Sequence, residues 1–142
     1  MDQVRSVDYA GVKPRWRQRF EFFDAHGAPA GRPFQQALRQ KSFKERAFWN
    51  WNVLAFIFGP FYFLTLGMWR KALTLLALSA TVVTLLAMVD FAIRFGNIPE
   101  FIWRAVPFAL AGLYGASADY AYYLHTTRNP QSWNPFEGIF RA

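Results

Sequence analysis

The stretch ALTLLALSATVVTLLAMV, residues 72–89, decides the fold of this chain. It contains no charged residue, and its large apolar side chains cover the whole circumference of a helix. It therefore lacks the polar face of a helix at the surface of a soluble protein. A membrane-spanning helix takes about 20 mostly apolar residues at ~1.5 Å per residue. Residues 72–95 and 101–127 both meet that length, so the sequence predicts two transmembrane helices, with a soluble buried hairpin as the alternative.

Another apolar stretch, NWNVLAFIFGPFYFLTLGMW at residues 50–69, is long enough to cross a bilayer but is interrupted by Gly59 and Pro60. Proline removes the hydrogen bond to the carbonyl of Phe56 and disfavours helical geometry in the residue before it. In lipid, the freed polar groups need partners within the protein, so the break predicts a kink or a re-entrant turn. We expect a re-entrant or interfacial hairpin, and a third crossing is the alternative.

Basic residues are concentrated before the apolar stretches, and the formal net charge is +7. Cytoplasmic segments of membrane proteins carry an excess of Lys and Arg. If residues 50–69 re-enter, both ends of the chain and the Arg70–Lys71 pair lie on the cytoplasmic side, and only Arg94 and Arg104 flank the outer loop. We therefore expect both termini in the cytoplasm. The basic residues of the first fifty positions are Arg5, Lys13, Arg15, Arg17, Arg19, Arg32, Arg39, Lys41, Lys44 and Arg46.

The N-terminal segment, residues 1–49, mixes cations with aromatic rings. KPRWRQRFEFF at residues 13–23 predicts anchoring at the membrane surface, with rings at headgroup depth and each cation on anionic lipid headgroups contributing ~1 kcal/mol. HGAPAGRP at residues 26–33 predicts a turn, because it is rich in Gly and Pro. Residues 33–49 predict a moderately amphipathic helix with one apolar face, made by Phe34, Ala37, Leu38, Phe48 and Trp49.

Asp119 is the most informative charged residue within the apolar stretches, because charge inside a membrane helix is costly and marks a functional candidate. We hypothesise that Asp119 pairs with Lys71 or Arg70 and so fixes the broken element to the hairpin. Asp90 and Arg94 are four residues apart and predict an ion pair on one helix face near the outer interface.

Small residues in the last apolar stretch form ridges at a spacing of four, which allow helix backbones to approach closely in lipid. The intramolecular partner helix is the expected contact, and a second copy or a larger partner protein is the alternative. The helix-packing candidates are Gly112, Gly115 and Ala116, with Ala111 and Ala118 beside them.

Enzyme chemistry is not expected. The chain has no cysteine, and its two histidines, His26 and His125, have no metal-ligand spacing. There is no Walker loop, no GxSxG elbow and no HExxH motif, so we expect neither cofactor nor metal. Nucleic acid is not expected as a partner either, because no groove-reading or RNA-binding motif accompanies the basic charge.

The segment AFIFGPFYFLTLGMWRKAL, residues 55–73, resembles a family of small bacterial inner-membrane proteins classed as a domain of unknown function. The resemblance covers residues 15–138. It departs from the family pattern at Val53, where many relatives carry an aromatic residue, and at Asp119, where Asn is equally usual. It implies a location in the bacterial inner membrane, and no activity, substrate or cofactor. The matching residues outside the segment are Arg19, Phe20, Phe22, Phe23, residues 26–29, Asn52, residues 118–123 and residues 133–136.

The sequence as a whole predicts an all-α integral membrane protein: a basic cytoplasmic segment at 1–49, a membrane domain at 50–127 and a cytoplasmic tail at 128–142. Two function classes follow. The first is a non-catalytic interaction or accessory module of a larger membrane assembly. The second is a small-solute or ion carrier, or a lipid-handling element, with its site at Gly59 and Pro60. The expected partners are the lipid bilayer, anionic headgroups, and a larger membrane protein or a second copy.

Overall fold

The computed structural model describes residues 9–93, 97–128 and 132–139, and within these residues the chain forms helices and no strands. The predicted all-α fold is therefore confirmed for that part of the chain. The helices are α1 (Pro14–His26), α2 (Arg32–Arg39), α3 (Phe43–Asn50), α4 (Val53–Phe58), α5 (Pro60–Thr65), α6 (Trp69–Ala92) and α7 (Glu100–Thr127).

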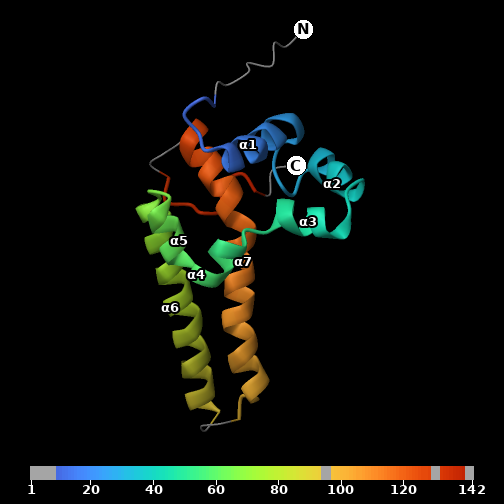
Figure 1. Ribbon diagram of the computed structural model, residues 1–142. Helices are drawn as coiled ribbons and strands as arrows, with labels where there is room; N and C mark the ends of the chain where they lie inside the picture. Colours follow the sequence, from blue (N-terminus) through green and yellow to red (C-terminus); the bar gives the residue numbers. More distant parts are fainter. Residues whose placement is uncertain (1–8, 94–96, 129–131, 140–142) are drawn as a thin grey trace.

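Two long helices, α6 and α7, run side by side and extend away from the other helices (Figure 1). Among the described helices, α6 is the one that is long and apolar enough to cross a membrane, and only 11% of its most apolar stretch is buried. α7 has 28 residues. Its Gly, Tyr, Ser and Asp residues lower its average hydropathy, so it does not meet the same standard. One of the two predicted spans is thus supported by both length and composition.

The broken element forms a V between the long helices (Figure 1). The side chain of Asn52 caps α4 by accepting hydrogen bonds from the backbone N–H of Leu54 and of Ala55. α4 ends at Phe58 and is followed by Gly59, whose φ of +54° favours glycine; Pro60 then opens α5 at a position that needs no N–H. Both open ends of the V lie toward the end of the molecule that carries α1. The predicted break is confirmed, and the chain turns back as a hairpin does.

The single amphipathic helix predicted for residues 33–49 is wrong, because Ser42 starts a new helix. Its hydroxyl accepts from the backbone N–H of Glu45, and the Glu45 carboxylate accepts from the backbone N–H of Ser42. This capping box ends the first segment and begins α3. The predicted turn at residues 26–33 is confirmed between α1 and α2, where Gly27 has a φ of +76°.

The aromatic rings of α1 form a protein core, which corrects their predicted position at headgroup depth. Trp16, Phe20 and Phe23 are buried against the last turns of α7, where they meet Tyr120 and Tyr123. Phe20 and Tyr123 pack edge to face with ring centroids 5.4 Å apart. These rings are therefore unavailable to lipid, while Lys13, Arg15 and Arg17 of the same segment are exposed.

Gly112 and Gly115 of α7 receive α4 and the residues before it, not the predicted hairpin partner α6, whereas Ala118 is buried in a core cluster that includes Ala72 and Leu75 of α6. A Cβ on Gly112 would lie 3.5 Å from Trp51, and one on Gly115 would lie 3.3 Å from the backbone oxygen of Asn52. The backbone N–H of Asn52 donates to the carbonyl of Gly115 at 2.9 Å. Ala116 is exposed, so its predicted place in a contact within the chain is wrong. Ala116 directly follows the buried Gly115, but it lies outside the helix face that packs against α4.

Candidate functional site

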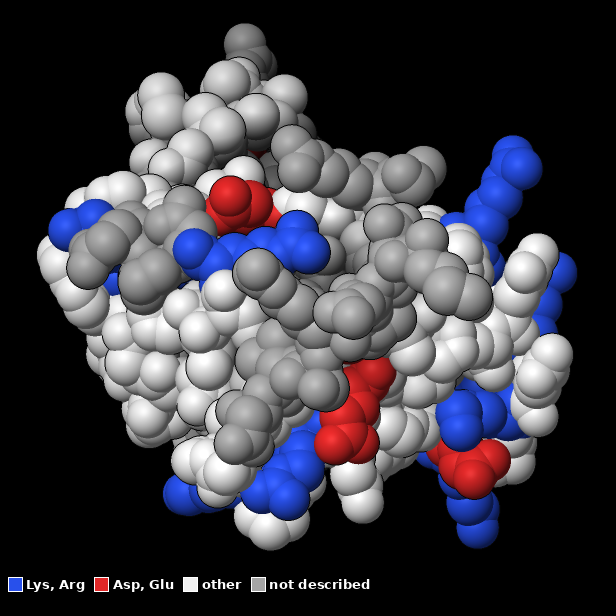
Figure 2. Space-filling model, turned by 90° about the horizontal axis from the view of Figure 1, so that it is seen from above, with Lys and Arg blue, Asp and Glu red and all other residues white. Residues whose placement is uncertain are grey.

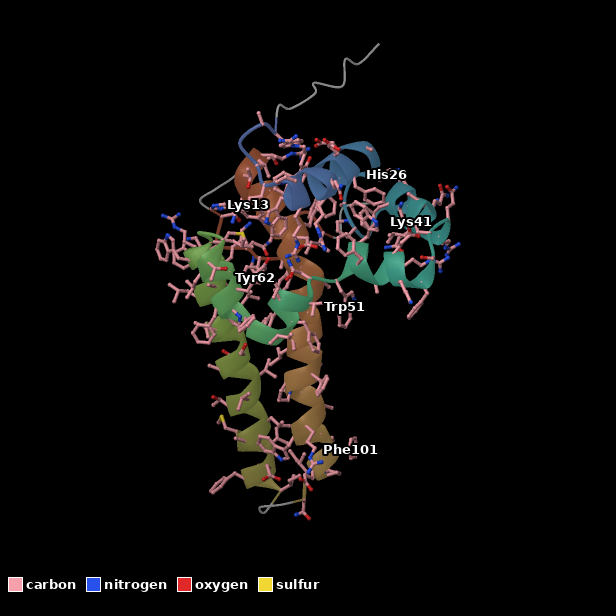
Figure 3. The ribbon with its side chains drawn as sticks, viewed as in Figure 1. Lys13, His26, Lys41, Trp51, Tyr62 and Phe101 are labelled. Atoms are coloured by element: carbon pink, nitrogen blue, oxygen red, sulfur yellow. The ribbon has the colours of Figure 1, made fainter. Side chains whose placement is uncertain are left out.

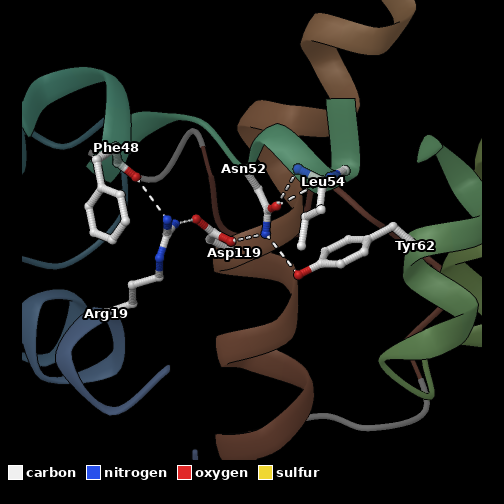
Figure 4. Close-up of polar contacts among 7 residues, drawn as sticks. Arg19, Phe48, Asn52, Leu54, Tyr62 and Asp119 are labelled. Atoms are coloured by element: carbon white, nitrogen blue, oxygen red, sulfur yellow. Dashed lines mark hydrogen bonds and ion pairs between the residues drawn. The ribbon is translucent and has the colours of Figure 1, made fainter. Parts of the chain in front are cut away.

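Asp119, the charged residue singled out in the sequence, lies in a buried polar cluster (Figure 4). Its carboxylate forms an ion pair with the Nη1 atom of Arg19, which comes from α1. Arg19 is 2% exposed and Asp119 is 4% exposed, so both charges are removed from water. Each of these charges requires the other, because an unpaired charge in a protein interior costs several kcal/mol.

Asn52 extends this cluster to the V of α4 and α5. Its Nδ2 donates to Oδ1 of Asp119 at 2.6 Å and to the hydroxyl of Tyr62 at 3.3 Å, while its Oδ1 caps α4 (Figure 4). The other terminal nitrogen of Arg19, Nη2, donates to the backbone carbonyl of Phe48 at 2.9 Å. The cluster therefore ties α1, α3, α4, α5 and α7 together at one point.

Lys71 and Arg70 do not pair with Asp119, which corrects the hypothesis made from the sequence. Lys71 is buried and its Nζ donates to the backbone carbonyl of Ala121 at 3.0 Å, two residues beyond Asp119 on α7. Arg70 points to the C-terminal segment and lies over the rings of Trp69 and Trp133, 5.3 and 5.5 Å from their centroids. Lys71 thus joins α6 to α7 through a backbone carbonyl, whereas the residue that links the broken element to Asp119 is Asn52.

The carboxylate of Asp24 makes a second polar bridge between α1 and α7. It accepts hydrogen bonds from the hydroxyl of Tyr9 at 2.5 Å and from the hydroxyl of Tyr123. Burial raises the pKa of Tyr9, and the hydrogen bond to Asp24 raises it further, so this phenol remains a neutral donor across the physiological range. Tyr9 and Tyr123 also belong to the aromatic core, so the bridge holds α1 on the end of α7.

The electrostatics of the cluster favour a permanent structural charge pair. Burial, together with the neighbouring charge of Arg15, lowers the pKa of Arg19 to about 10. The guanidinium therefore keeps its proton at neutral pH. The positive charge of Arg19 and the negative charge of Asp119 cancel. In the part of the chain that the structure describes, no three metal-ligating side chains come together. The arrangement can hold helices in register, and it presents no nucleophile with an adjacent base.

The remaining predicted residues fall elsewhere. Gly59 and Pro60 lie at the tip of the V, where a Cβ on Gly59 would be 3.3 Å from the ring of Tyr114. Asp90 accepts a hydrogen bond from the backbone N–H of Ile98 at 3.1 Å. The predicted ion pair between Asp90 and Arg94 lies outside the described residues, because Arg94 does.

Sequence reasoning missed three members of the cluster: Arg19, Asn52 and Tyr62. A signal existed for two of them. Asn52 stands directly before an apolar run, as a helix cap does. Arg19 lies within a set of aromatic residues at helical spacing, Trp16, Phe20 and Phe23, and this places it beside the buried face of α1. No local pattern marks Tyr62 as a partner of Asn52.

Comparison with known proteins identifies the family. Residues 5–128 match the family described as "Protein of unknown function (DUF2628)". A relative from Salmonella typhimurium (strain LT2), described as "Uncharacterized protein YigF", is 26% identical over 87 residues, which cover 58% of this chain and 69% of the relative. The protein of the same description from Escherichia coli (strain K12) is 31% identical over 71 residues, or 47% of this chain and 56% of the relative. No solved structure matches this chain. Because the family match spans most of its length, the chain belongs to the DUF2628 family.

Proposed function

We propose that the protein is an integral protein of the bacterial inner membrane in which α6 and α7 cross the bilayer and the V of α4 and α5 re-enters it. The observation that carries this is the surface of the stem, which we define as residues 76–92 of α6 and 100–113 of α7. None of these described stem residues is fully buried, although most are apolar. Phe91, Phe101 and Phe108 are between 66% and 71% exposed. An apolar surface of this extent is suited to lipid.

The opposite end of the molecule supports an orientation with both termini in the cytoplasm. We define the collar as α1 to α5 together with residues 114–127 of α7. Lys13, His26 and Lys41 lie at the collar end, and Phe101 lies at the far end of the stem (Figure 3). Seen from above, Lys and Arg side chains are spread around the rim of the collar, with Asp and Glu among them (Figure 2). An excess of Lys and Arg favours the cytoplasmic side.

We further propose that the protein has no catalytic activity and acts as an interaction or accessory module of a larger membrane assembly. The buried charged groups Arg19, Lys71 and Asp119 join helices, and we assign the partner to the outer surface of α7. Small side chains recur along that surface at Ala105, Ala109 and Ala116, and all three are exposed. Small residues at this spacing permit close packing of a second helix in lipid.

The experiment is purification of the tagged full-length chain from native membranes in a mild detergent, with Ala116→Leu as a variant. We expect the chain to resist extraction from membranes by alkaline carbonate and to retain a larger membrane protein in fixed ratio. Ala116→Leu, which adds bulk at an exposed position, should lose that partner and keep the thermal stability of the wild type. A chain that carbonate extracts would contradict the membrane location. Retention of the partner by Ala116→Leu would contradict the proposal that the partner binds this surface of α7.

A second candidate function, lipid handling at Gly59 and Pro60, is favoured by one observation. A hollow of about 230 Å³ lies beside the tip of the V and is lined by Leu54, Phe58, Phe61, Tyr62 and Thr65. Its polar groups are already engaged, since Thr65 donates to the carbonyl of Tyr62 and the hydroxyl of Tyr62 accepts from Asn52. Such a hollow suits an acyl chain and gives no support to the transport of an ion or polar solute.

A further inference from the structure

A second hollow, of about 390 Å³, opens between α1 and α3 on the outer side of the buried charge pair. Three of its lining residues are cations: Arg15 and Arg19 from α1, and Lys44 from α3. Arg15 and Lys44 are exposed, and the ion pair with Asp119 neutralises only Arg19. Among the described residues that line the hollow, none is acidic. The hollow is therefore a concentrated positive site, suited to an anionic group.

The hollow is also lined by the apolar side chains of Phe48, Trp51 and Val53. Trp51 is 45% exposed and Val53 is 62% exposed. The side chain of Trp51 hangs from the junction of α3 and α4 toward the stem (Figure 3). A ligand that fills this hollow therefore meets both cations and apolar groups.

The apolar lining continues along the molecule toward the stem. The ring of Trp51 lies 5.6 Å from that of Phe56, and Phe56 lies 5.9 Å from Phe108, measured between ring centroids. Phe56 and Phe108 line a groove of about 210 Å³ together with Pro107 and Ala111. The cationic hollow and the apolar groove thus form one path, which begins in the collar and runs down the outside of α7.

We propose that this path is the binding site of an anionic phospholipid. The phosphate lies against Arg15 and Lys44, the interfacial part of the lipid lies against Trp51, and one acyl chain follows Phe56 and Phe108. Charge complementarity supports an anion, and the groove below supports a lipid in place of a free phosphate. The inference rests on the proposed membrane location, because only there does the groove face acyl chains.

The test uses the purified full-length chain in a neutral detergent, with bound lipids counted by native mass spectrometry. The probes are phosphatidylglycerol, which is anionic, and phosphatidylcholine, which has no net charge. Arg15→Gln combined with Lys44→Gln removes the two exposed cations of the hollow. Arg32→Gln combined with Arg39→Gln removes two exposed cations of α2 and is the matched control. Phe108→Ala shortens the apolar groove and leaves the cations in place.

We expect wild type to retain phosphatidylglycerol in preference to phosphatidylcholine. Loss of Arg15 and Lys44 should weaken that binding by roughly 30-fold, since each of two cations close to an anionic headgroup is removed. The α2 control should stay within about threefold of wild type, because diffuse attraction is screened over a Debye length. Phe108→Ala should also weaken the binding of phosphatidylglycerol, and millimolar inorganic phosphate should not displace this lipid.

Equal losses in the two double variants would overturn the proposal, because they would show diffuse attraction to the whole basic segment. Retention of phosphatidylcholine as well as phosphatidylglycerol would overturn it too, as would displacement by inorganic phosphate. Carbonate extraction of the same chain from native membranes tests the proposed membrane location separately. If the chain resists carbonate and yet retains no phosphatidylglycerol, the lipid site alone is wrong.

Discussion

The collar and the stem are built on opposite plans, although they share the helix α7. In the collar, aromatic rings and charges alike are buried, with Phe20, Phe34 and the pair Arg19–Asp119 inside. In the stem, large apolar side chains point outward, and none of the described residues is fully buried. Under the proposed membrane location, the difference follows from the solvent of each region: α1 to α3 face water and need a core, whereas lipid can cover the apolar side chains of the stem.

The largest expected effect is in the collar. Asp119→Ala leaves the buried guanidinium of Arg19 without its partner, so we expect the free energy of unfolding in detergent to fall by about 3–5 kcal/mol. The measurement is thermal unfolding of the purified chain. The matched control is Glu100→Gln in the stem, which breaks the pair Arg104–Glu100, whose side chains are 78% and 77% exposed. The control should change stability by less than about 1 kcal/mol. Equal effects would remove the distinction between the two regions.

The next effect concerns the stem. Leu85 is 57% exposed, and Leu85→Lys places a charge on a surface that we assign to lipid. Insertion should become less favourable by about 2.5–3.5 kcal/mol, seen as a smaller fraction of the chain in the carbonate-resistant pellet. Gln36→Lys, at an exposed position of α2, is the control and should leave that fraction unchanged. If Leu85→Lys behaves like the control, the surface of the stem is not covered by lipid.

A smaller effect is expected where the collar meets the stem on α7. Gly115→Leu forces a side chain against Asn52 and Phe56, both about 3.3 Å from an added Cβ, and overpacking should cost about 1–3 kcal/mol. Ala116→Leu is adjacent but exposed, and it should change stability by about 0.5 kcal/mol or less. Thermal unfolding of the two variants side by side provides the measurement. A larger loss of stability for Ala116→Leu than for Gly115→Leu would contradict the packed face that we assign to α7.

The smallest pair of effects differs in sign. Gly59 has a φ of +54°, so Gly59→Ala should strain the tip of the V and destabilise the chain by about 1–2 kcal/mol. Gly112 lies within α7 with only ordinary contact to Trp51, so Gly112→Ala should stabilise by roughly 0.5–1 kcal/mol. Both changes are read from melting temperatures under the same conditions. Two changes of the same sign would contradict the conformation assigned to one of these glycines.

The sequence predicted those features that depend on neighbouring residues. Gly59 and Pro60 mark the break because both act on the local backbone, and the helical hairpin follows from its apolar composition. Ser42 and Glu45 carry a local signal that the periodicity of the surrounding apolar residues concealed. The pairing of Arg19 with Asp119 could not be predicted, because 100 residues separate them and many other cations were available. Gly115 and Ala116 look alike in sequence, and only the position of α4 decides which is packed.

The most direct test of the central claim, that lipid surrounds the stem, uses the absence of cysteine from the chain. Met88→Cys introduces a thiol in the stem, where Met88 is 62% exposed, and Phe43→Cys introduces one in the collar, where Phe43 is 85% exposed. Both are treated with a membrane-impermeant maleimide, in spheroplasts and in inside-out vesicles. We predict that Phe43→Cys is labelled in inside-out vesicles, and that Met88→Cys is labelled from neither side until detergent is added. Labelling of Met88→Cys in intact membranes, at the rate seen for Phe43→Cys, would contradict the account.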